Sequence, residues 1–325
     1  MPRNEPADAL KAALMILVVV GHVFLESVSG NALKGAIYVF HMPMFLALSG
    51  YWFKPPRDIA DLLRKAIPRY LSPWVIATAL YFSVLWITRS EVPFTILRAL
   101  SAPWFHLWFV PALFLFCFIT TLLRRLPALA VLSVFFLPHL AIWAGFPVEE
   151  ITGPIDTRYI TYGLYFAVGY CWREHSPRLH WSVPLAMLII GAALAWSLFP
   201  LGGKWPDVLS RSLLSGGAIG LVHAFSSVGL GSLSDNLFAR ESLAIYLYHY
   251  LPILLMKSYA NLMSSGTYWV VSLFAGLVVV PMAISAARRL PFSELVLGTL
   301  PSLQKILRDS SLSGGGGQPV GKTRS

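Results

Sequence analysis

Charged residues are scarce in this chain. They make up 12% of its 325 residues, whereas a soluble domain typically contains about 25%. A soluble protein of this length would have too few ionic groups to cover its surface. Hydrophobic residues make up 56% of the chain and its mean hydropathy is +0.66, which excludes intrinsic disorder. The composition therefore predicts a membrane protein that crosses the bilayer several times.

Cysteines and acidic residues are also few. The two cysteines, Cys117 and Cys171, lie in apolar segments, so they form neither a disulfide framework nor a CxxC metal site. We expect both to be packing residues and expect no bound metal. The chain has 15 acidic and 25 basic residues. Because the basic residues lie in short gaps between apolar runs, they favour a positive-inside topology over nucleic-acid binding.

Long apolar runs are what the chain has in abundance. A helix needs about 20 apolar residues to cross the hydrocarbon layer. We predict an all-α bundle of about ten transmembrane helices, over residues 9–27, 35–53, 69–88, 105–123, 128–144, 158–172, 182–200, 208–230, 241–262 and 267–287. The distribution of Lys and Arg between the two sides predicts that both termini are cytoplasmic.

The two ends of the chain are assigned on composition. The first apolar run carries Asp8, Lys11 and His22 and has no small-residue cleavage site, so we do not expect it to be a signal peptide. Residues 309–325 include four consecutive glycines, which is typical of a flexible tail. We therefore predict one transmembrane domain over residues 1–308 and a cytoplasmic tail over residues 309–325.

Ionisable residues inside an apolar run are the first candidates for chemistry, because burying them in a membrane is costly. Lys11 and His22 are eleven residues apart, which places them on one helical face with about 16 Å of rise between them. Glu26 would lie one turn beyond His22 and orient its imidazole, as the carboxylate does in a catalytic triad. Alternatively, Lys11 reaches the lipid headgroups, His22 links helices by a hydrogen bond, and Glu26 faces external water.

The second apolar run contains His41, Pro43 and the pair Ser49-Gly50. A short connection predicts that the first two runs form an antiparallel hairpin, with His41 at a depth similar to that of His22. Pro43 removes a backbone donor and would open a cavity by kinking the helix. The alternative is a packing kink at which Ser49 and Gly50 allow close helix approach.

The densest basic stretch follows the second run and contains Lys54, Arg57, Arg64, Lys65 and Arg69. Such a cluster at the cytoplasmic rim is suited to binding the phosphates of a ligand. It is equally typical of a topology signal that binds anionic lipids. The chain has no P-loop and no GxGxxG motif, so the sequence does not support a nucleotide site built on a glycine-rich loop.

Other polar positions give weaker signals. The run from Trp104 to Pro111, which includes His106 and Trp108, places aromatic residues where an external interfacial belt is expected. Glu149 and Arg158 lie in the most acidic gap, which is either a site for a polar acceptor or a solvated loop. His249 is a further histidine inside an apolar run. We expect His139 and His223 to be structural.

Several short motifs resemble the acyltransferase-3 family of membrane-bound sugar O-acyltransferases, in particular its fucose 4-O-acetylase-like branch. They are Asp8-x-x-Lys11, the Lys11-x10-His22 element that ends in Gly21-His22, Phe40-His41-Met42-Pro43-Met44-Phe45, Leu48-Ser49-Gly50-Tyr51, His106-Leu107-Trp108-Phe109-Val110-Pro111-Ala112-Leu113 and Ser242-x-x-Ile245-Tyr246-Leu247-Tyr248-His249. The match runs in order over nearly the whole apolar region.

The resemblance implies a ten-helix enzyme that moves an acyl group, usually acetyl, from cytosolic acyl-CoA to a carbohydrate hydroxyl. It implies that His22 is the catalytic histidine and Lys11 its paired basic residue. The family often has two basic residues three apart after the second span, but here Ala66 lies three before Arg69. Arg64 and Lys65 are near substitutes, so the donor-binding set is Lys54, Arg57, Arg64, Lys65 and Arg69.

The remaining expectations complete this interpretation. We expect His41, Trp108, Glu149, Arg158 and His249 to contact the carbohydrate acceptor. The expected partners are acyl-CoA, the acceptor glycan, membrane lipids and polysaccharide-assembly proteins, in a bacterial inner membrane and without nucleic acid.

Two other classes of function stay open at this stage. One is a transporter or flippase for a sugar or lipid-linked sugar, which often shows paired repeats that we do not find here; the other is a structural subunit of a polysaccharide-assembly complex.

Overall fold

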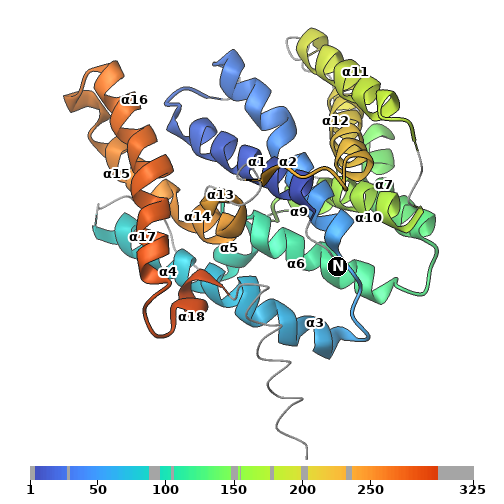
Figure 1. The fold of residues 1–325 in the computed structure, drawn as a ribbon, viewed down its shortest axis with the longest axis horizontal. Coiled ribbons are helices and arrows are strands. Elements are labelled where there is room, and N and C mark those ends of the chain that lie inside the picture. The colour runs from blue at the N-terminus through green and yellow to red at the C-terminus, as the bar shows by residue number, and fades with distance from the viewer. Residues whose placement is uncertain are drawn as a thin grey trace, which may run out of the picture.

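Helices make up all the regular structure in the described part of the chain (Figure 1). The structure, a computed structural model, describes residues 4–27, 30–87, 96–103, 106–147, 153, 155–175, 179–198, 204–231 and 236–298. Within these residues no strand occurs, so the predicted all-α class is confirmed. Glu149 and the predicted tail over residues 309–325 lie outside the described residues.

The first half of the chain contains eight α-helices and one π-helical turn among the described residues. Their bounds are α1 (Glu5–Val23), α2 (Ala32–Trp52), α3 (Ile59–Ala66), the π-helix η1 (Ile67–Leu71), α4 (Ser72–Ile87), α5 (Ile96–Ser101), α6 (Phe109–Leu122), α7 (Ala128–Trp143) and α9 (Arg158–Thr161). Helix α3, the π-helix η1 and helix α4 follow one another without a break, so residues 59–87 form one long helical element.

The second half of the described chain begins with α10 (Gly163–His175). It continues with α11 (Ser182–Leu198), α12 (Lys204–Ala224), α13 (Leu237–Arg240), α14 (Ser242–Tyr248), α15 (Tyr250–Ser258), the 3-10 turn η4 (Ala260–Leu262), α16 (Ser265–Phe274), the π-helix η5 (Ala275–Val279), α17 (Val280–Ala287) and α18 (Ser293–Leu297). Here α16, η5 and α17 also form one continuous element.

Within the described residues, four helical elements are long and apolar enough to cross a membrane: Glu5–Val23, Ala32–Trp52, Ile59–Ile87 and Ser265–Ala287. Three more apolar helices of 10–17 residues lie over Phe109–Leu122, Ala128–Trp143 and Ser182–Ser197. The prediction of several membrane-crossing helices is thus supported for these segments. The full number of ten and the cytoplasmic position of both termini stay predictions.

Asparagine caps begin the first two helices. The side-chain oxygen of Asn4 accepts from the backbone N–H of Ala7, and that of Asn31 accepts from Lys34, both at 3.0 Å. Such caps satisfy N–H groups that have no partner inside the helix. Because only a short connection separates α1 from α2, the two helices pack against each other as the predicted hairpin.

The backbones of α2 and α10 touch at two glycines. A β-carbon at Gly50 would overlap the main-chain oxygen of Phe166, and one at Gly169 would overlap that of Ala47. The contact is therefore reciprocal, with each helix presenting a glycine to a carbonyl of the other. Small residues allow this close approach of apolar helices, which was the alternative interpretation of Ser49-Gly50. It fixes α10, and the helices that pack on α10, against the hairpin.

A proline divides the predicted run 241–262 into α14 and α15. Pro252 has no N–H to donate to the carbonyl of Tyr248 four residues earlier. The helical hydrogen-bond pattern is interrupted there, and His249 lies between the two helices with its backbone still helical (φ −58°, ψ −30°). The interruption therefore coincides with the histidine.

A buried ion pair holds the start of α14. Glu241 is 2% exposed, and its Oε2 accepts from Nε and Nη2 of Arg288 at 3.0 and 2.7 Å. Arg288 also donates to the main-chain oxygens of Gly298 and Leu297. A single side chain after α17 thus joins α14 to the last described residues of the chain.

We expect Gly50→Ala and Gly169→Ala to destabilise the protein by about 2 kcal/mol or more each. The added methyl group would overlap a main-chain carbonyl of the facing helix, which can move aside only if the helices separate. The measurement is the Tm of detergent-solubilised protein. Gly266→Ala in α16 is the matched control, since a β-carbon there meets open space. Equal Tm values for all three variants would contradict the close contact of α2 with α10.

Candidate functional site

Three imidazoles from distant parts of the chain meet at the end of α1. The ring centroid of His22 lies 5.4 Å from that of His106 and 5.2 Å from that of His249, and the last two are 4.9 Å apart. His22 belongs to the last turn of α1, His106 to the turn before α6, and His249 to the break between α14 and α15. We call these three residues the histidine cluster.

The hydrogen bonds of His249 fix its tautomer. Its Nδ1 lies 2.9 Å from the main-chain oxygens of both Ile245 and Tyr246. Because a carbonyl only accepts, Nδ1 must carry the proton. In the neutral ring Nε2 is then an acceptor, and it is buried with no hydrogen-bond partner among the described residues. His249 therefore presents a free lone pair inside the protein.

His106 has the opposite tautomer. Its Nε2 lies 3.4 Å from the main-chain oxygen of Leu247, so Nε2 is the donor and Nδ1 the acceptor. That Nδ1 is also buried without a partner. The cluster thus contains two unpaired basic nitrogens beside His22.

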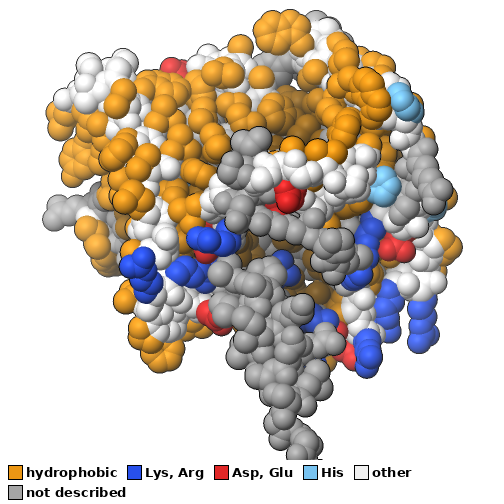
Figure 2. Space-filling view, in the orientation of Figure 1, with side chains coloured by type: hydrophobic (Ala, Val, Ile, Leu, Met, Phe, Trp, Pro, Cys, Tyr) orange, Lys and Arg blue, Asp and Glu red, His pale blue; other side chains and the backbone are white. Residues whose placement is uncertain are grey.

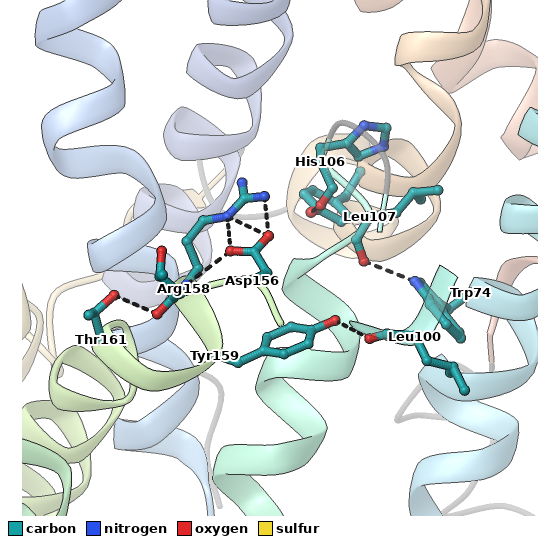
Figure 3. Close-up of polar contacts among 10 residues, drawn as sticks. Trp74, Leu100, His106, Leu107, Asp156, Arg158, Tyr159 and Thr161 are labelled. Atoms are coloured by element: carbon teal, nitrogen blue, oxygen red, sulfur yellow. Dashed lines mark hydrogen bonds and ion pairs between the residues drawn. The ribbon is translucent and has the colours of Figure 1, made fainter. Parts of the chain in front are cut away.

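Two side chains hold the turn that carries His106 by donating hydrogen bonds to its main-chain carbonyls (Figure 3). The indole Nε1 of Trp74 donates to the carbonyl of Leu107 at 2.9 Å, and the hydroxyl of Tyr246 donates to the carbonyl of His106. Pro111 explains why the Leu107 carbonyl is available, because Pro111 has no N–H to donate four residues back. The motif from His106 to Pro111 therefore sets the position of this imidazole.

Tyrosines surround His22 on its remaining sides. The hydroxyl of Tyr38 lies 3.4 Å from Nδ1 of His22, and the ring centroid of Tyr250 lies 4.9 Å from the imidazole. His22 is half-buried, whereas His106 is 3% and His249 0% exposed. The member of the cluster singled out from the sequence is thus the most accessible of the three.

The structure corrects the predicted position of Glu26. Helix α1 ends at Val23, because Phe24 has an extended backbone (φ −57°, ψ 132°). Glu26 therefore does not lie one helical turn beyond His22, and its side chain is exposed. Its main-chain oxygen accepts from Nζ of Lys34 at 2.6 Å. The neighbours of the His22 imidazole include instead the rings of His249 and His106.

Lys11 lies on α1 with His22, as predicted, but toward the other end of the helix. Eleven residues of α-helix correspond to about 16 Å, so Lys11 does not contact the imidazole directly. Its Nζ donates to Oδ1 of Asp8 at 2.9 Å. Asp8-x-x-Lys11 is thus an ion pair on the helix surface.

His41 is next to the cluster rather than part of it. Its Nδ1 donates to the carbonyl of Ile37 at 2.6 Å, one turn earlier in α2. The ring of Tyr38 separates it from His22, with centroids 5.0 Å from His41 and 6.0 Å from His22. Pro43 lies inside α2, and the helix continues past it to Trp52.

Trp108 and Arg158 form a stacked pair. The guanidinium carbon of Arg158 lies 4.4 Å from the centroid of the Trp108 ring. Nε of Arg158 donates to both carboxylate oxygens of Asp156 at 2.8 and 3.0 Å (Figure 3). Trp108 is 3% exposed, so it packs inside the protein and is not part of a lipid-facing aromatic belt, contrary to our expectation for this run. Glu149, predicted beside them, lies outside the described residues.

The basic stretch lies near the opposite end of α1. In Figure 2, Lys and Arg side chains gather in the lower half of the view, where Figure 1 shows α3, while the upper half is mostly hydrophobic. Arg64 and Lys65 are 76% and 62% exposed and both pair with Asp61, at 3.7 and 2.8 Å. Asp61, absent from the predicted site, therefore offsets part of this charge.

Comparison with known proteins identifies the family. The sequence model of the acyltransferase-3 family, described as an acyltransferase domain, matches residues 6–287. The chain belongs to the acyltransferase-3 family. No curated protein and no solved structure matches it. The family match contains the whole histidine cluster and the basic stretch, and it supports a membrane acyltransferase in general.

Sequence reasoning missed His106 and Tyr250 as neighbours of His22. His106 was noted only within an aromatic run, although the same run matched a family motif. Tyr250 follows His249 directly, so the end of the last motif was its only signal. Where the structure describes the chain, no three His, Cys, Asp or Glu side chains have the geometry of a metal site; the absence of a metal stays a prediction.

The difference in exposure within the cluster can be measured. We expect diethyl pyrocarbonate, which modifies accessible imidazoles, to react with His22 faster than with His106 and His249, because only His22 is half-buried. Peptide mass spectrometry gives the extent at each residue, with the exposed His180 as the reference. Full modification of His180 with none at His22 would show that the cluster is closed to water-soluble reagents.

Proposed function

We propose that this membrane acyltransferase is an O-acyltransferase that moves an acetyl group from cytosolic acetyl-CoA to a carbohydrate hydroxyl of a cell-surface or secreted glycan. The observation that carries the proposal is the half-buried His22 beside two buried imidazoles with free acceptor nitrogens. Such an arrangement suits proton transfer or acyl transfer by histidine. The family match supports the class of reaction.

The donor is assigned to the Lys11 end of α1. Acetyl-CoA carries phosphates, and Lys54, Arg57, Arg64, Lys65 and Arg69 supply cations close together in the sequence. Arg64 and Lys65 are exposed, so they can leave Asp61 for a stronger anion. The pantetheine arm of CoA is long enough to carry the thioester from this surface toward His22, past Lys11.

The chemistry at His22 follows from its neighbours. A sugar hydroxyl attacks the thioester carbonyl while the imidazole takes the hydroxyl proton; the carbon–sulfur bond breaks, and the same proton returns to the departing thiolate to give CoA thiol. A covalent acyl-imidazole is the alternative sequence at the same residue. In either case the free nitrogens of His249 and His106 accept hydrogen bonds from N–H groups that form in the cluster.

The acceptor is assigned to the residues on the other side of the cluster. Trp108 and the Asp156–Arg158 pair combine an aromatic face with donors and acceptors that suit sugar hydroxyls. His41, Glu149 and His249 complete the acceptor set we propose. The corresponding location is a bacterial inner membrane, with polysaccharide-assembly proteins as partners and a fucose 4-O-acetylase-like relationship within the family.

We expect His22→Ala to abolish acceptor-dependent release of CoA thiol from acetyl-CoA, because no other accessible base lies at its position. The measurement is thiol release by purified protein with and without a membrane carbohydrate fraction. His139→Gln is the control, since His139 lies outside the cluster and its Nε2 donates to the carbonyl of Thr161. Full activity in His22→Ala, or uptake of sugar without thiol release, would contradict the proposal.

We expect the double variant Arg64→Gln/Lys65→Gln to raise the KM for acetyl-CoA about tenfold and to leave kcat nearly unchanged. The reason is that it removes phosphate contacts that are equally strong in the ground and transition states. Steady-state kinetics at varied acetyl-CoA measures both constants. Arg125→Gln removes an exposed cation outside this stretch and is the matched control. A fall in kcat with constant KM would exclude a donor-binding role.

A further inference from the structure

Two lysines lie beyond the histidine cluster, on the side away from Lys11. Lys34 belongs to the first turn of α2, which follows the end of α1, and Lys257 to the last turn of α15. Neither residue belongs to the motifs or to the acceptor set named above. Both are half-buried.

Each lysine lies over a tyrosine that contacts His22. Nζ of Lys34 is 5.7 Å from the centroid of the Tyr38 ring, and Nζ of Lys257 is 5.2 Å from that of Tyr250. The same rings lie 6.0 and 4.9 Å from the imidazole of His22. Each ammonium group therefore shares one aromatic neighbour with the catalytic candidate.

The two ammonium groups are also close enough to act on each other electrostatically. Bringing two cations together in a partly buried place is unfavourable unless an anion offsets the repulsion. The carboxylate of Glu26 acts on Lys34, which leaves two cations against one anion.

Four other half-buried cations in the described chain each pair with a carboxylate. Lys11 pairs with Asp8, Arg158 with Asp156, Arg211 with Asp207 and Arg288 with Glu241. Among the residues that the structure describes, neither Lys34 nor Lys257 has a carboxylate within ion-pair distance. In this part of the chain the two lysines thus lack the ion-pair partner that those four cations have.

Both lysines keep donors for a ligand. Lys34 Nζ donates to the main-chain oxygen of Glu26, and Lys257 Nζ lies 3.5 Å from the hydroxyl of Tyr250. An ammonium group has three N–H donors, so two remain on each side chain. Four donors with two positive charges match the oxygens of one phosphate or carboxylate.

We infer that the acceptor is acidic, and that Lys34 and Lys257 bind a phosphate or carboxylate group attached to the sugar whose hydroxyl reacts at His22. This inference rests on the proposed function and adds the chemical class of the acceptor. The anion neutralises the two lysines on binding and holds the sugar beside Tyr38 and Tyr250. An acidic acceptor and an anionic phospholipid headgroup share this chemistry, so the experiment must separate them.

The test uses the full-length protein in vesicles with radiolabelled acetyl-CoA. Membrane carbohydrate from cells that lack the protein is separated by anion exchange into acidic and neutral fractions, and each is offered as acceptor. The variants are Lys34→Gln/Lys257→Gln and the charge-preserving Lys34→Arg/Lys257→Arg, with Arg125→Gln as the control. Each protein is assayed in phosphatidylcholine vesicles and in vesicles that also contain phosphatidylglycerol.

We expect label in the acidic fraction, in both vesicle types. The double Gln variant should lower kcat/KM for that fraction at least tenfold through KM, whereas the double Arg variant and Arg125→Gln should retain it. Label mainly in the neutral fraction, or a double Gln variant equal to wild type, would overturn the inference while leaving acyl transfer intact. Activity that follows phosphatidylglycerol and not the acceptor would assign the lysines to lipid and overturn it too. Absence of label from every fraction would refute the proposed function itself.

Discussion

The hydrogen bonds from His249 to its own helix are the constraint on which the candidate site depends. Its Nδ1 proton is shared by the carbonyls of Ile245 and Tyr246, and in apolar surroundings such a bond is not exchanged for water. The ring therefore cannot turn its donor toward His22. The cluster therefore contains a fixed acceptor nitrogen on His249, and His106 supplies a second one by the same means through Leu247.

A site of this kind needs polar groups where apolar helices would otherwise pack completely. The chain provides them at interruptions of its helices: the end of α1, the turn before α6 and the break at Pro252. Each interruption leaves backbone groups that must be satisfied within the protein, and the side chains that satisfy them also position the imidazoles. Trp74 and Tyr246 do this for the His106 turn. The histidines and the helix breaks are thus parts of one arrangement.

The sequence predicted the placement of Lys11 and His22 on α1 better than it predicted the residues around His22. Lys11 and His22 lie on one face of α1 because eleven residues are about three helical turns. This follows from the spacing alone. The end of α1 at Val23 was missed, because no Gly or Pro marks it, and Glu26 was consequently misplaced. His106 and His249 meet His22 only through tertiary packing of α4, α6, α14 and α15, which helical periodicity does not contain. The burial of Trp108 was not indicated either, since an aromatic run looks alike at a lipid interface and in a core.

The ion pair of Arg288 with Glu241 connects the site to a part of the chain outside the family match. The match ends at residue 287, yet the guanidinium of the next residue neutralises the carboxylate at the base of α14 and holds the carbonyls of Leu297 and Gly298. A chain shortened to the matched segment would keep every histidine, but the buried Glu241, one helix away from His249, would lose both short contacts with Arg288. Of the ion pairs that the structure describes for Glu241, only the one with Arg240 at 3.7 Å would remain. The unit that neutralises the base of α14 is therefore longer than the segment by which the family is recognised.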